Sequence, residues 1–266
     1  MQELTATIRR ILERDRVWSA YALGDLSAEL AAYCEWFVSS APPPALLLLF
    51  RAFDPPVLFA HGDADALTSL VARVTEPIVT IQLRREALRA IDTRYRIASP
   101  RPMWRMALDI ERVTAPAPVG SALPLGCADI GDLRMLYADG LASGEAPDCF
   151  QDAMVERGIY RGAREGGALI AAAGTHLVSA GNDVCAIGNV YTRRDRRRRG
   201  LATQVIRSVV SEALARHLST IVLNVAQDNE ALRMYEHLGF RRHCELIEGT
   251  AVLRSGIRGH ARRVLI

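Results

Sequence analysis

Apolar residues recur along the second half of this chain with the two spacings that distinguish strands from helices. The pattern predicts strands at 158–163, 168–179, 184–192, 220–225 and 240–248, and helices at 129–141, 202–214 and 230–238. Glu165-Gly166-Gly167 is a good hairpin turn between the first two strands. Asn229 is suited to cap the last helix, and Gly239 to end it in a left-handed conformation.

The first half shows the same mixture of elements. Helices are expected at 3–12, 64–74 and 85–91, and strands at 45–50, 56–60, 77–83 and 103–110. Thr114-Ala115-Pro116-Ala117-Pro118 is typical of a linker. We therefore expect a domain at 1–113, a linker at 114–118 and a second domain at 119–266. The order of elements in the first domain is similar to a shortened tandem copy of the second. An unrelated α/β cap domain is the alternative.

A strongly basic turn separates the strand at 184–192 from the helix that follows it. Six of the seven residues from Arg193 to Arg199 are arginine, and Gly200 comes directly after them. The free N–H groups and the positive dipole end of a helix favour an anion at this point. Gly200 lets the backbone approach the anion, and the arginines would add charge-assisted hydrogen bonds to phosphate. The chain has no lysine and no G-x-G-x-x-G string, which excludes the common nucleotide-triphosphate and dinucleotide loops.

Two motifs carry a resemblance to a known family. Arg197-Arg198-Arg199-Gly200-Leu201-Ala202 fits the pattern R/Q-x-x-G-x-G/A, and residues 227–240 resemble N-x-x-A-x-x-x-Y-x-x-x-G-F with slightly shifted spacing. Over about residues 118–248 the chain resembles the GNAT superfamily of acyl-CoA-dependent N-acetyltransferases. The resemblance implies an α/β fold of the α+β type, with a mixed, mostly antiparallel central sheet flanked by helices. It also implies direct transfer of an acetyl or other short acyl group from acyl-CoA to a primary amine of a small molecule or peptide.

The resemblance further implies which residues hold acetyl-CoA. The pyrophosphate would lie on the basic turn and the pantetheine arm beside the preceding strand, where a main-chain N–H near Val190 would donate to the thioester oxygen. The implied cofactor-binding residues are Val190, Tyr191, Thr192, Arg197, Arg198, Arg199, Gly200, Leu201, Ala202, Thr203, Asn224, Asn229 and Tyr235. No metal is expected.

Tyr235 stands at the position that matches the family's general acid. A phenol with a pKa near ~10 is a sensible proton donor to the departing thiolate. The alternative is a packing role, because Ala231, Tyr235 and Leu238 also form an apolar stripe at helical spacing.

The general base is less well marked. Some relatives carry a glutamate where this chain has Ala186. His176, on the neighbouring strand, is a candidate base that could face the acceptor, although a lone strand histidine is more often structural. Glu145 and Asp148, in the loop after the helix at 129–141, are candidates for binding the acceptor amine, with solvated loop charges as the alternative. A water relay without a dedicated base stays open.

Composition narrows the class of protein. The formal net charge of +3 is small, and no aromatic residues interleave with the arginines to stack bases. The five cysteines form no C-x-x-C pair, so neither a disulfide framework nor a zinc site is expected. The first residues lack the apolar region of a signal peptide, and the longest apolar run, 41–50, is too short to span a bilayer. We expect a cytoplasmic protein that binds no nucleic acid, membrane or metal, and that could form a homodimer.

Two alternatives to acyl transfer remain for the function of this protein. A catalytically inactive acyl-CoA-binding sensor is the alternative function, and a nucleic-acid-binding protein is a more remote one.

In the first half, Gly62-Asp63-Ala64-Asp65 precedes a helix. The two aspartates cap that helix well but would repel a pyrophosphate. Acyl-CoA is therefore expected to bind only in the second half.

Overall fold

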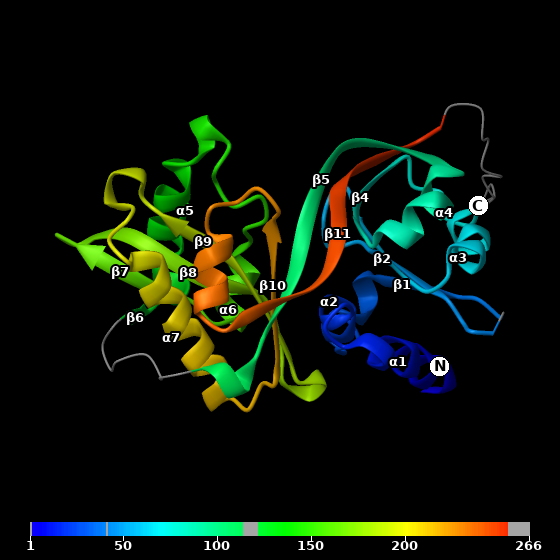
Figure 1. The fold of residues 1–266 in the computed structure, drawn as a ribbon, viewed down its shortest axis with the longest axis horizontal. Coiled ribbons are helices and arrows are strands. Elements are labelled where there is room, and N and C mark those ends of the chain that lie inside the picture. Colours follow the sequence, from blue (N-terminus) through cyan, green and yellow to red (C-terminus); the bar gives the residue numbers. More distant parts are fainter. Residues whose placement is uncertain (1, 41, 114–121, 255–266) are drawn as a thin grey trace, which may run out of the picture. The chain divides into compact units, whose positions relative to one another are not determined.

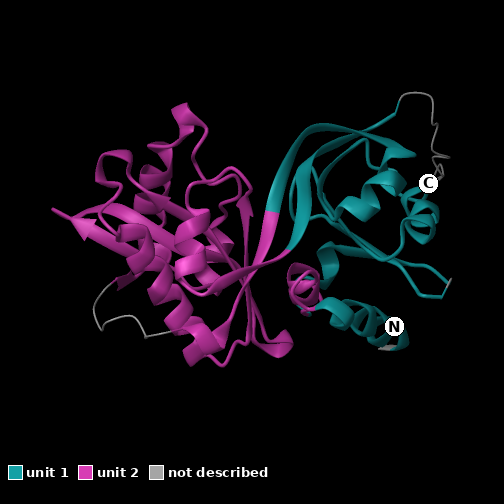
Figure 2. Cartoon of the chain, in the orientation of Figure 1, with its two compact units in different colours: residues 1–15, 28–103, 244–266 teal, residues 16–27, 104–243 magenta. Residues whose placement is uncertain are grey.

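A computed structural model describes residues 2–40, 42–113 and 122–254 (Figure 1). The chain divides into two compact units whose residues are interleaved in the sequence (Figure 2). Unit 1 comprises the residues up to 15, 28–103 and those from 244 onward, and unit 2 comprises 16–27 and 104–243. The strands β5 (Tyr95–Leu108) and β11 (Phe240–Leu253) each supply residues to both units.

These units differ from the domains expected at 1–113 and 119–266. The physical reason is long-range pairing: β11 pairs antiparallel with β4 (Ile78–Leu83), so the end of the described chain joins the sheet of the first half. The predicted linker at 114–118 lies outside the described residues. The suggestion that the first half is a shortened copy of the second stays a prediction.

Unit 1 is built on a sheet with the strand order β1-β2-β3-β4-β11. Its other strands are β1 (Cys34–Val38), β2 (Leu46–Phe50) and β3 (Val57–His61). Pairing is antiparallel except between β3 and β4, which are parallel. The apolar run of β2 is almost wholly buried because a central strand covered on both faces needs no alternation. Its helices are α1 (Gln2–Leu12), α3 (Ala64–Val71) and α4 (Leu88–Asp92).

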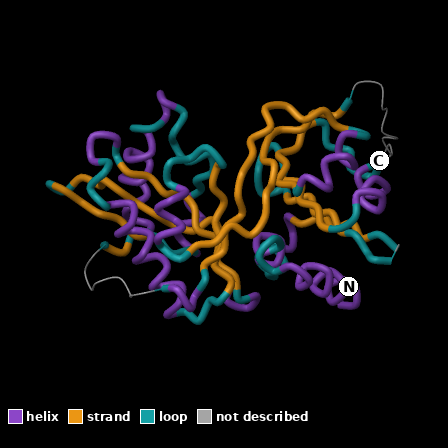
Figure 3. The backbone as a smooth tube through the Cα atoms, in the orientation of Figure 1, coloured by secondary structure: helices purple, strands orange, loops and turns teal. Residues whose placement is uncertain are grey.

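The sheet of unit 2 has the order β10-β9-β8-β7-β6. Its strands are β6 (Leu123–Pro124), β7 (Arg161–Glu165), β8 (Ala168–Ser179), β9 (Val184–Thr192) and β10 (Thr220–Ala226). All neighbours pair antiparallel except β9 and β10, which are parallel. The helices are α2 (Ala20–Gly24), α5 (Ile130–Ala138), α6 (Asp152–Arg157), α7 (Leu201–Ala215) and α8 (Leu232–His237). Figure 3 colours helices purple and strands orange along the backbone. The mixed, mostly antiparallel sheet flanked by helices confirms the expected fold class.

The core of unit 2 lies between the sheet and α7. Val205 and Val209, on the apolar face of α7, are fully buried against Ile187 of β9 and Leu223 of β10. This is the stripe that the helical spacing predicts. Among the described residues, no helix is both long and apolar enough to cross a lipid bilayer.

Candidate active site

Two adjacent parallel strands of unit 2 part from one another halfway along their length. β9 and β10 pair from Val184 opposite Thr220 to Ile187 opposite Leu223. The next residues, Gly188 and Asn224, lie beyond the pairing. On its other side β9 is bulged against β8: the register shifts between Ala172 and Gly174, and Asn189 has a φ of 51°. A bulge adds local twist and re-aims a strand, so the second half of β9 leaves β10 and an opening begins at Gly188.

The basic turn follows the end of β9. Residues Arg194–Arg196 form a single 3₁₀ turn, and Gly200 precedes α7 with a left-handed φ of 75°. A Cβ on Gly200 would meet no atom within 4 Å, so its surroundings are open. The first hydrogen bond of α7 runs from Gln204 N–H to Gly200 O at 3.0 Å. The N–H groups of residues 201–203 therefore lie in the unbonded first turn of the helix.

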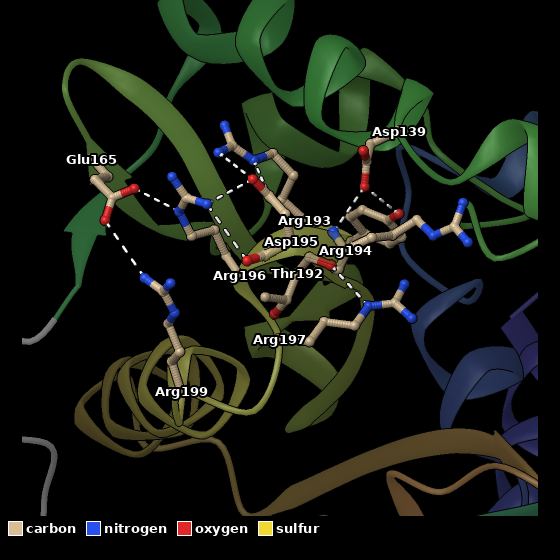
Figure 4. Close-up of polar contacts among 10 residues, drawn as sticks. Asp139, Glu165, Thr192, Arg193, Arg194, Asp195, Arg196, Arg197 and Arg199 are labelled. Atoms are coloured by element: carbon tan, nitrogen blue, oxygen red, sulfur yellow. Dashed lines mark hydrogen bonds and ion pairs between the residues drawn. The ribbon is translucent and has the colours of Figure 1, made fainter.

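The arginines of this turn lie among carboxylates (Figure 4). Five of the six form ion pairs: Arg193 with Asp195, Arg194 and Arg197 with Glu145, and Arg196 and Arg199 with Glu165. Within the part of the chain that the structure describes, Arg198 has no such pair. Arg197, Arg198 and Arg199 were expected to bind phosphate, and the fold brings the carboxylates of Glu145 and Glu165 to four of the six arginines.

Glu145 is the most heavily engaged of these carboxylates. Its Oε1 accepts from Arg197 at 2.7 Å and its Oε2 from the Ser143 hydroxyl at 2.6 Å. Arg197 and Ser143 together hold the pKa of Glu145 at about 2. The structure therefore places Glu145 against the basic turn, and both Glu145 and Asp148 are exposed. That these two residues bind the acceptor amine stays a prediction.

Aromatic and acidic side chains brace the end of β9. The Tyr191 hydroxyl donates to Asp139 at 2.9 Å, and the same carboxylate oxygen accepts the main-chain N–H of Arg194 at 2.9 Å. The Arg197 guanidinium lies 5.7 Å from the centre of the Tyr191 ring. Through these contacts the end of β9, at 190–192, is held next to the turn that begins at Arg197. Both stretches belong to the expected cofactor-binding residues.

Two expected cofactor residues lie on the other side of the opening. Asn224 is on β10, and its side-chain oxygen accepts a 2.6 Å hydrogen bond from Arg105 of β5. Arg105 is fully buried, and sequence reasoning missed it. An arginine among the apolar positions of a strand was the available signal. Asn229 caps the turn before α8, because its side-chain oxygen accepts the N–H of Ala231 at 2.8 Å, although α8 itself begins at Leu232.

Tyr235, the candidate acid, lies in the core of unit 2. Its side chain is 8% exposed and its ring meets that of Phe240 edge to face, with centroids 6.1 Å apart. Burial raises the pKa of Tyr235 to about 12. The phenol therefore keeps its proton at neutral pH, and both the acid role and the packing role are compatible with this position.

His176, the candidate base, contacts a helix that the sequence analysis missed. The Tyr21 hydroxyl of α2 lies 3.0 Å from Nδ1 of His176. Burial lowers the pKa of His176 to about 4, partly offset by the Asn189 side chain. The ionisation near pH 6.5 that an ordinary histidine would show is therefore not expected here. Ala186, at the position of the glutamate in some relatives, is completely buried.

Other candidate chemistry adds little. None of the five cysteines, all of which lie in the described ranges, forms a disulfide bond. Among the described residues, no three histidine, cysteine, aspartate or glutamate side chains gather in a group that could hold a metal ion.

The sheet, the opening and the turn can be compared with known proteins. No curated protein matches the chain. In solved structures, the chain is similar to a GNAT-family protein from Novosphingobium aromaticivorans, with a TM-score of 0.61 and 19% identity over 91% of this chain and 100% of the other. It is also similar to a GCN5-related N-acetyltransferase from Kribbella flavida, with a TM-score of 0.59 and 17% identity over 91% and 95%. At such identities the likeness concerns the fold.

A match to a family profile covers the site itself. The profile described as "Acetyltransferase (GNAT) family" matches residues 130–240, which run from the start of α5 to the start of β11. This segment contains the bulged strand β9, the basic turn and α7, together with Tyr235. The chain therefore carries, at residues 130–240, a domain of the GNAT acetyltransferase family.

Proposed function

We propose that this protein is an N-acyltransferase that binds acetyl-CoA, or another short acyl-CoA, and moves its acyl group directly to a primary amine. The observation that carries the proposal is the turn from Arg197 to Ala202. It opens α7 with a left-handed Gly200 and an unbonded first turn of N–H groups, immediately after a strand that parts from its neighbour. Those donors and the helix dipole suit the pyrophosphate of the cofactor.

The rest of the cofactor follows the opening between β9 and β10. The pantetheine arm lies beside residues 190–192, and a main-chain N–H near Val190 donates to the thioester oxygen as negative charge develops there. The amine nitrogen attacks the thioester carbon, the C–N bond forms, the C–S bond breaks and the thiolate leaves. Tyr235 donates the proton that the thiolate takes up, and His176 is the candidate that accepts the proton of the amine.

Substitution of Gly200 tests the proposal. Gly200→Asp places a carboxylate at the anion position, and we expect the affinity for acetyl-CoA, measured by calorimetry, to fall roughly 10–100-fold through charge repulsion. Gly200→Asn is the matched control, because asparagine has nearly the same shape and tolerates the left-handed conformation without a charge. Its affinity should stay within a few-fold of wild type. Equal affinity in the two variants would remove the turn as the pyrophosphate site.

The acyl transfer needs its own assay. Amino acids, polyamines, aminoglycosides and peptide N-termini are screened with acetyl-CoA, and both free CoA thiol and acylated amine are measured. Thiol release without acylated amine is uncoupled hydrolysis and does not count as transfer. Binding of acetyl-CoA without turnover of any amine would favour the sensor, a function that the buried Ala186 at the position of a glutamate base supports.

A further inference from the structure

The contact between Tyr21 and His176 joins two segments that are far apart in the sequence. Tyr21 belongs to α2, near the start of the chain, and His176 to β8, yet both lie in unit 2. The phenol oxygen and Nδ1 are 3.0 Å apart. A neutral imidazole carries one proton, so the partner of Nδ1 decides which ring nitrogen is left bare.

Three contacts fix Tyr21 in place. Gly24, one turn after Tyr21, packs so closely on β8 that a Cβ there would lie 2.0 Å from a methyl group of Leu177. The guanidinium of Arg105 lies 4.8 Å from the centre of the Tyr21 ring. Arg105 also donates to the main-chain oxygen of Trp18 at 3.2 Å, which anchors the start of the helix. A side chain held from both sides can orient its neighbour at little entropic cost.

The other ring nitrogen of His176 lies over the start of the opening. A Cβ on Gly188 would lie 2.1 Å from Nε2, so only glycine leaves room for the imidazole there. Gly188 is the first residue of β9 beyond its pairing with β10. Next to it, the side-chain oxygen of the buried Asn189 accepts no hydrogen bond from a described residue. The Asn189 side chain favours the protonated imidazole.

We propose that Tyr21 is a positioning residue whose hydroxyl accepts the Nδ1–H of His176, leaving the bare Nε2 at the opening to take the proton of the attacking amine. The inference rests on the proposed function. As the amine nitrogen bonds to the thioester carbon, one N–H proton passes to Nε2, and the Asn189 side chain favours the protonated imidazole that results. The C–S electron pair leaves on the thiolate, which is protonated separately. The products are an amide, a thiol and an imidazolium that returns its proton to water.

The ionisable side chain in direct contact with His176 is Tyr21. Farther away, the Asn189 amide donates to the Tyr160 hydroxyl, the Arg105 guanidinium lies on the Tyr21 ring, and the Asp25 carboxyl directly follows the last residue of α2. Burial raises the pKa of Asp25 to about 8, so that this carboxyl is largely uncharged near pH 7. Because burial lowers its own pKa, the imidazole keeps its proton-accepting form throughout the neutral range.

Nitrogen NMR on ¹⁵N-histidine-labelled protein tests the tautomer without any acyl-CoA. In the wild type at pH 7, the resonances of His176, assigned with His176→Gln, should report a protonated Nδ1 and a bare Nε2. Tyr21→Phe keeps the ring on Arg105 but removes the hydroxyl, and the two tautomers should then mix. Tyr33→Phe, at an exposed tyrosine of unit 1, is the control and should leave the spectrum of His176 unchanged. A wild-type imidazole protonated at Nε2 would overturn the proposal.

A double-mutant cycle tests the catalytic consequence with the panel amine that gives the highest kcat/KM. We expect kcat to fall about 10-fold in Tyr21→Phe and about 100-fold or more in His176→Gln, with KM for acetyl-CoA within about twofold. If Tyr21 acts through His176, the double variant should be no slower than His176→Gln alone. Effects that multiply would show that Tyr21 has a separate, structural role, and would overturn the proposal.

The outcomes separate this inference from the proposed function. A wild-type protein that fails to bind acetyl-CoA in calorimetry contradicts the proposed function, and the transfer step of the inference with it. Normal acetyl-CoA binding and turnover, with multiplying effects or an unchanged tautomer in Tyr21→Phe, contradicts the role of Tyr21 alone. Gly188→Ala gives a second approach: the added methyl group should displace the imidazole and lower kcat while the affinity for acetyl-CoA is retained.

Discussion

Burial shifts the pKa values of the two candidate catalytic side chains in opposite directions. It raises that of Tyr235 to about 12 and lowers that of His176 to about 4. Both shifts have the same cause, because an apolar setting disfavours whichever form carries charge. Near neutral pH the phenol can only give up a proton and the imidazole can only accept one. This is the division of labour that the transfer of an acyl group to an amine needs.

Removing the Tyr235 hydroxyl distinguishes its catalytic role from packing. In Tyr235→Phe the ring contact with Phe240 is retained, so we expect affinity for acetyl-CoA to be nearly unchanged. The proton donor to the thiolate is lost, and kcat should fall roughly 10–10³-fold. Steady-state kinetics on a verified amine, with calorimetry for the affinity, makes the measurement. An unchanged kcat would assign Tyr235 to packing and leave the thiolate to be protonated by solvent.

For single residues, the sequence identified the candidates but not their burial or their contact partners. Tyr235 and the residues of the basic turn were found because a short motif marks them. Tyr21, Arg105 and Asn189 were missed. Tyr21 and Arg105 acquire their importance from partners 155 and 119 positions away in the chain. The lowered pKa of His176 could not be predicted either, because the burial that causes it cannot be read from the sequence around one side chain.

At the scale of the elements, the loop that contains Glu145 is acidic where it meets the basic turn before α7. Glu145 pairs with both Arg194 and Arg197, the latter standing at the first position of the pyrophosphate motif. A bound pyrophosphate would compete with this carboxylate for the same guanidinium. The turn before α7 thus already binds an anion from the protein itself, the Glu145 carboxylate.

Neutralising that carboxylate should strengthen cofactor binding. In Glu145→Gln we expect the Kd for acetyl-CoA to fall about two- to fivefold, since exposed ion pairs contribute little each. The gain should shrink at high salt, which screens both arms of the competition. Glu156→Gln, an equal change of charge on α6, is the control and should leave the Kd unchanged. Weaker binding by Glu145→Gln would mean that Glu145 holds Arg197 ready for the ligand instead of competing with it.

Strong periodicity explains which elements were predicted well. The strands at 168–179 and 184–192 have the bounds that their apolar patterns predict, and α7 begins within one residue of its expected start. The helices α2 and α6 were missed because five and six residues are too few to show a helical period. β11 runs five residues beyond its predicted end, since its continuation is specified by pairing with β4 and not by local sequence.

Across the whole molecule, the two units offer very different helix N-termini to an anion. In unit 1, Asp63 caps α3 by accepting the N–H of Asp65 at 2.8 Å, and Asp65 adds a second negative charge to the first turn. In unit 2, the first turn of α7 has no acidic residue. Charge therefore separates two sites that the order of elements alone would make alike.

We expect one acetyl-CoA to bind per chain. Calorimetric titration of the full-length protein should give a stoichiometry of one, and thermal unfolding should shift upward with acetyl-CoA concentration as for a single site. In Gly200→Asp the single binding event should weaken as expected above, with no second component of wild-type affinity. A stoichiometry of two, or a component of wild-type affinity in that variant, would contradict the assignment of unit 1 as a non-binding unit.

The domain boundary was the least predictable feature at this scale. A proline-rich stretch at 114–118 marks a change in the chain, but it carries no information about which distant strands will pair. The interleaving comes from β5 and β11, each of which passes from one unit into the other. Patterns in a single sequence also could not show that the fold is similar to a solved structure over 91% of this chain.

The pairing of β4 with β11 has a consequence for the newborn chain on the ribosome. β4 emerges early, whereas its partner β11 appears only after β5 to β10 have been made. At synthesis rates of ~5–20 residues per second, β4 waits on the order of ten seconds with one edge uncovered. An uncovered edge is a template for misplaced strands. Because β11 is the last strand to be made, the sheet that begins with β1 to β4 stays incomplete until nearly all of the described chain has been synthesised.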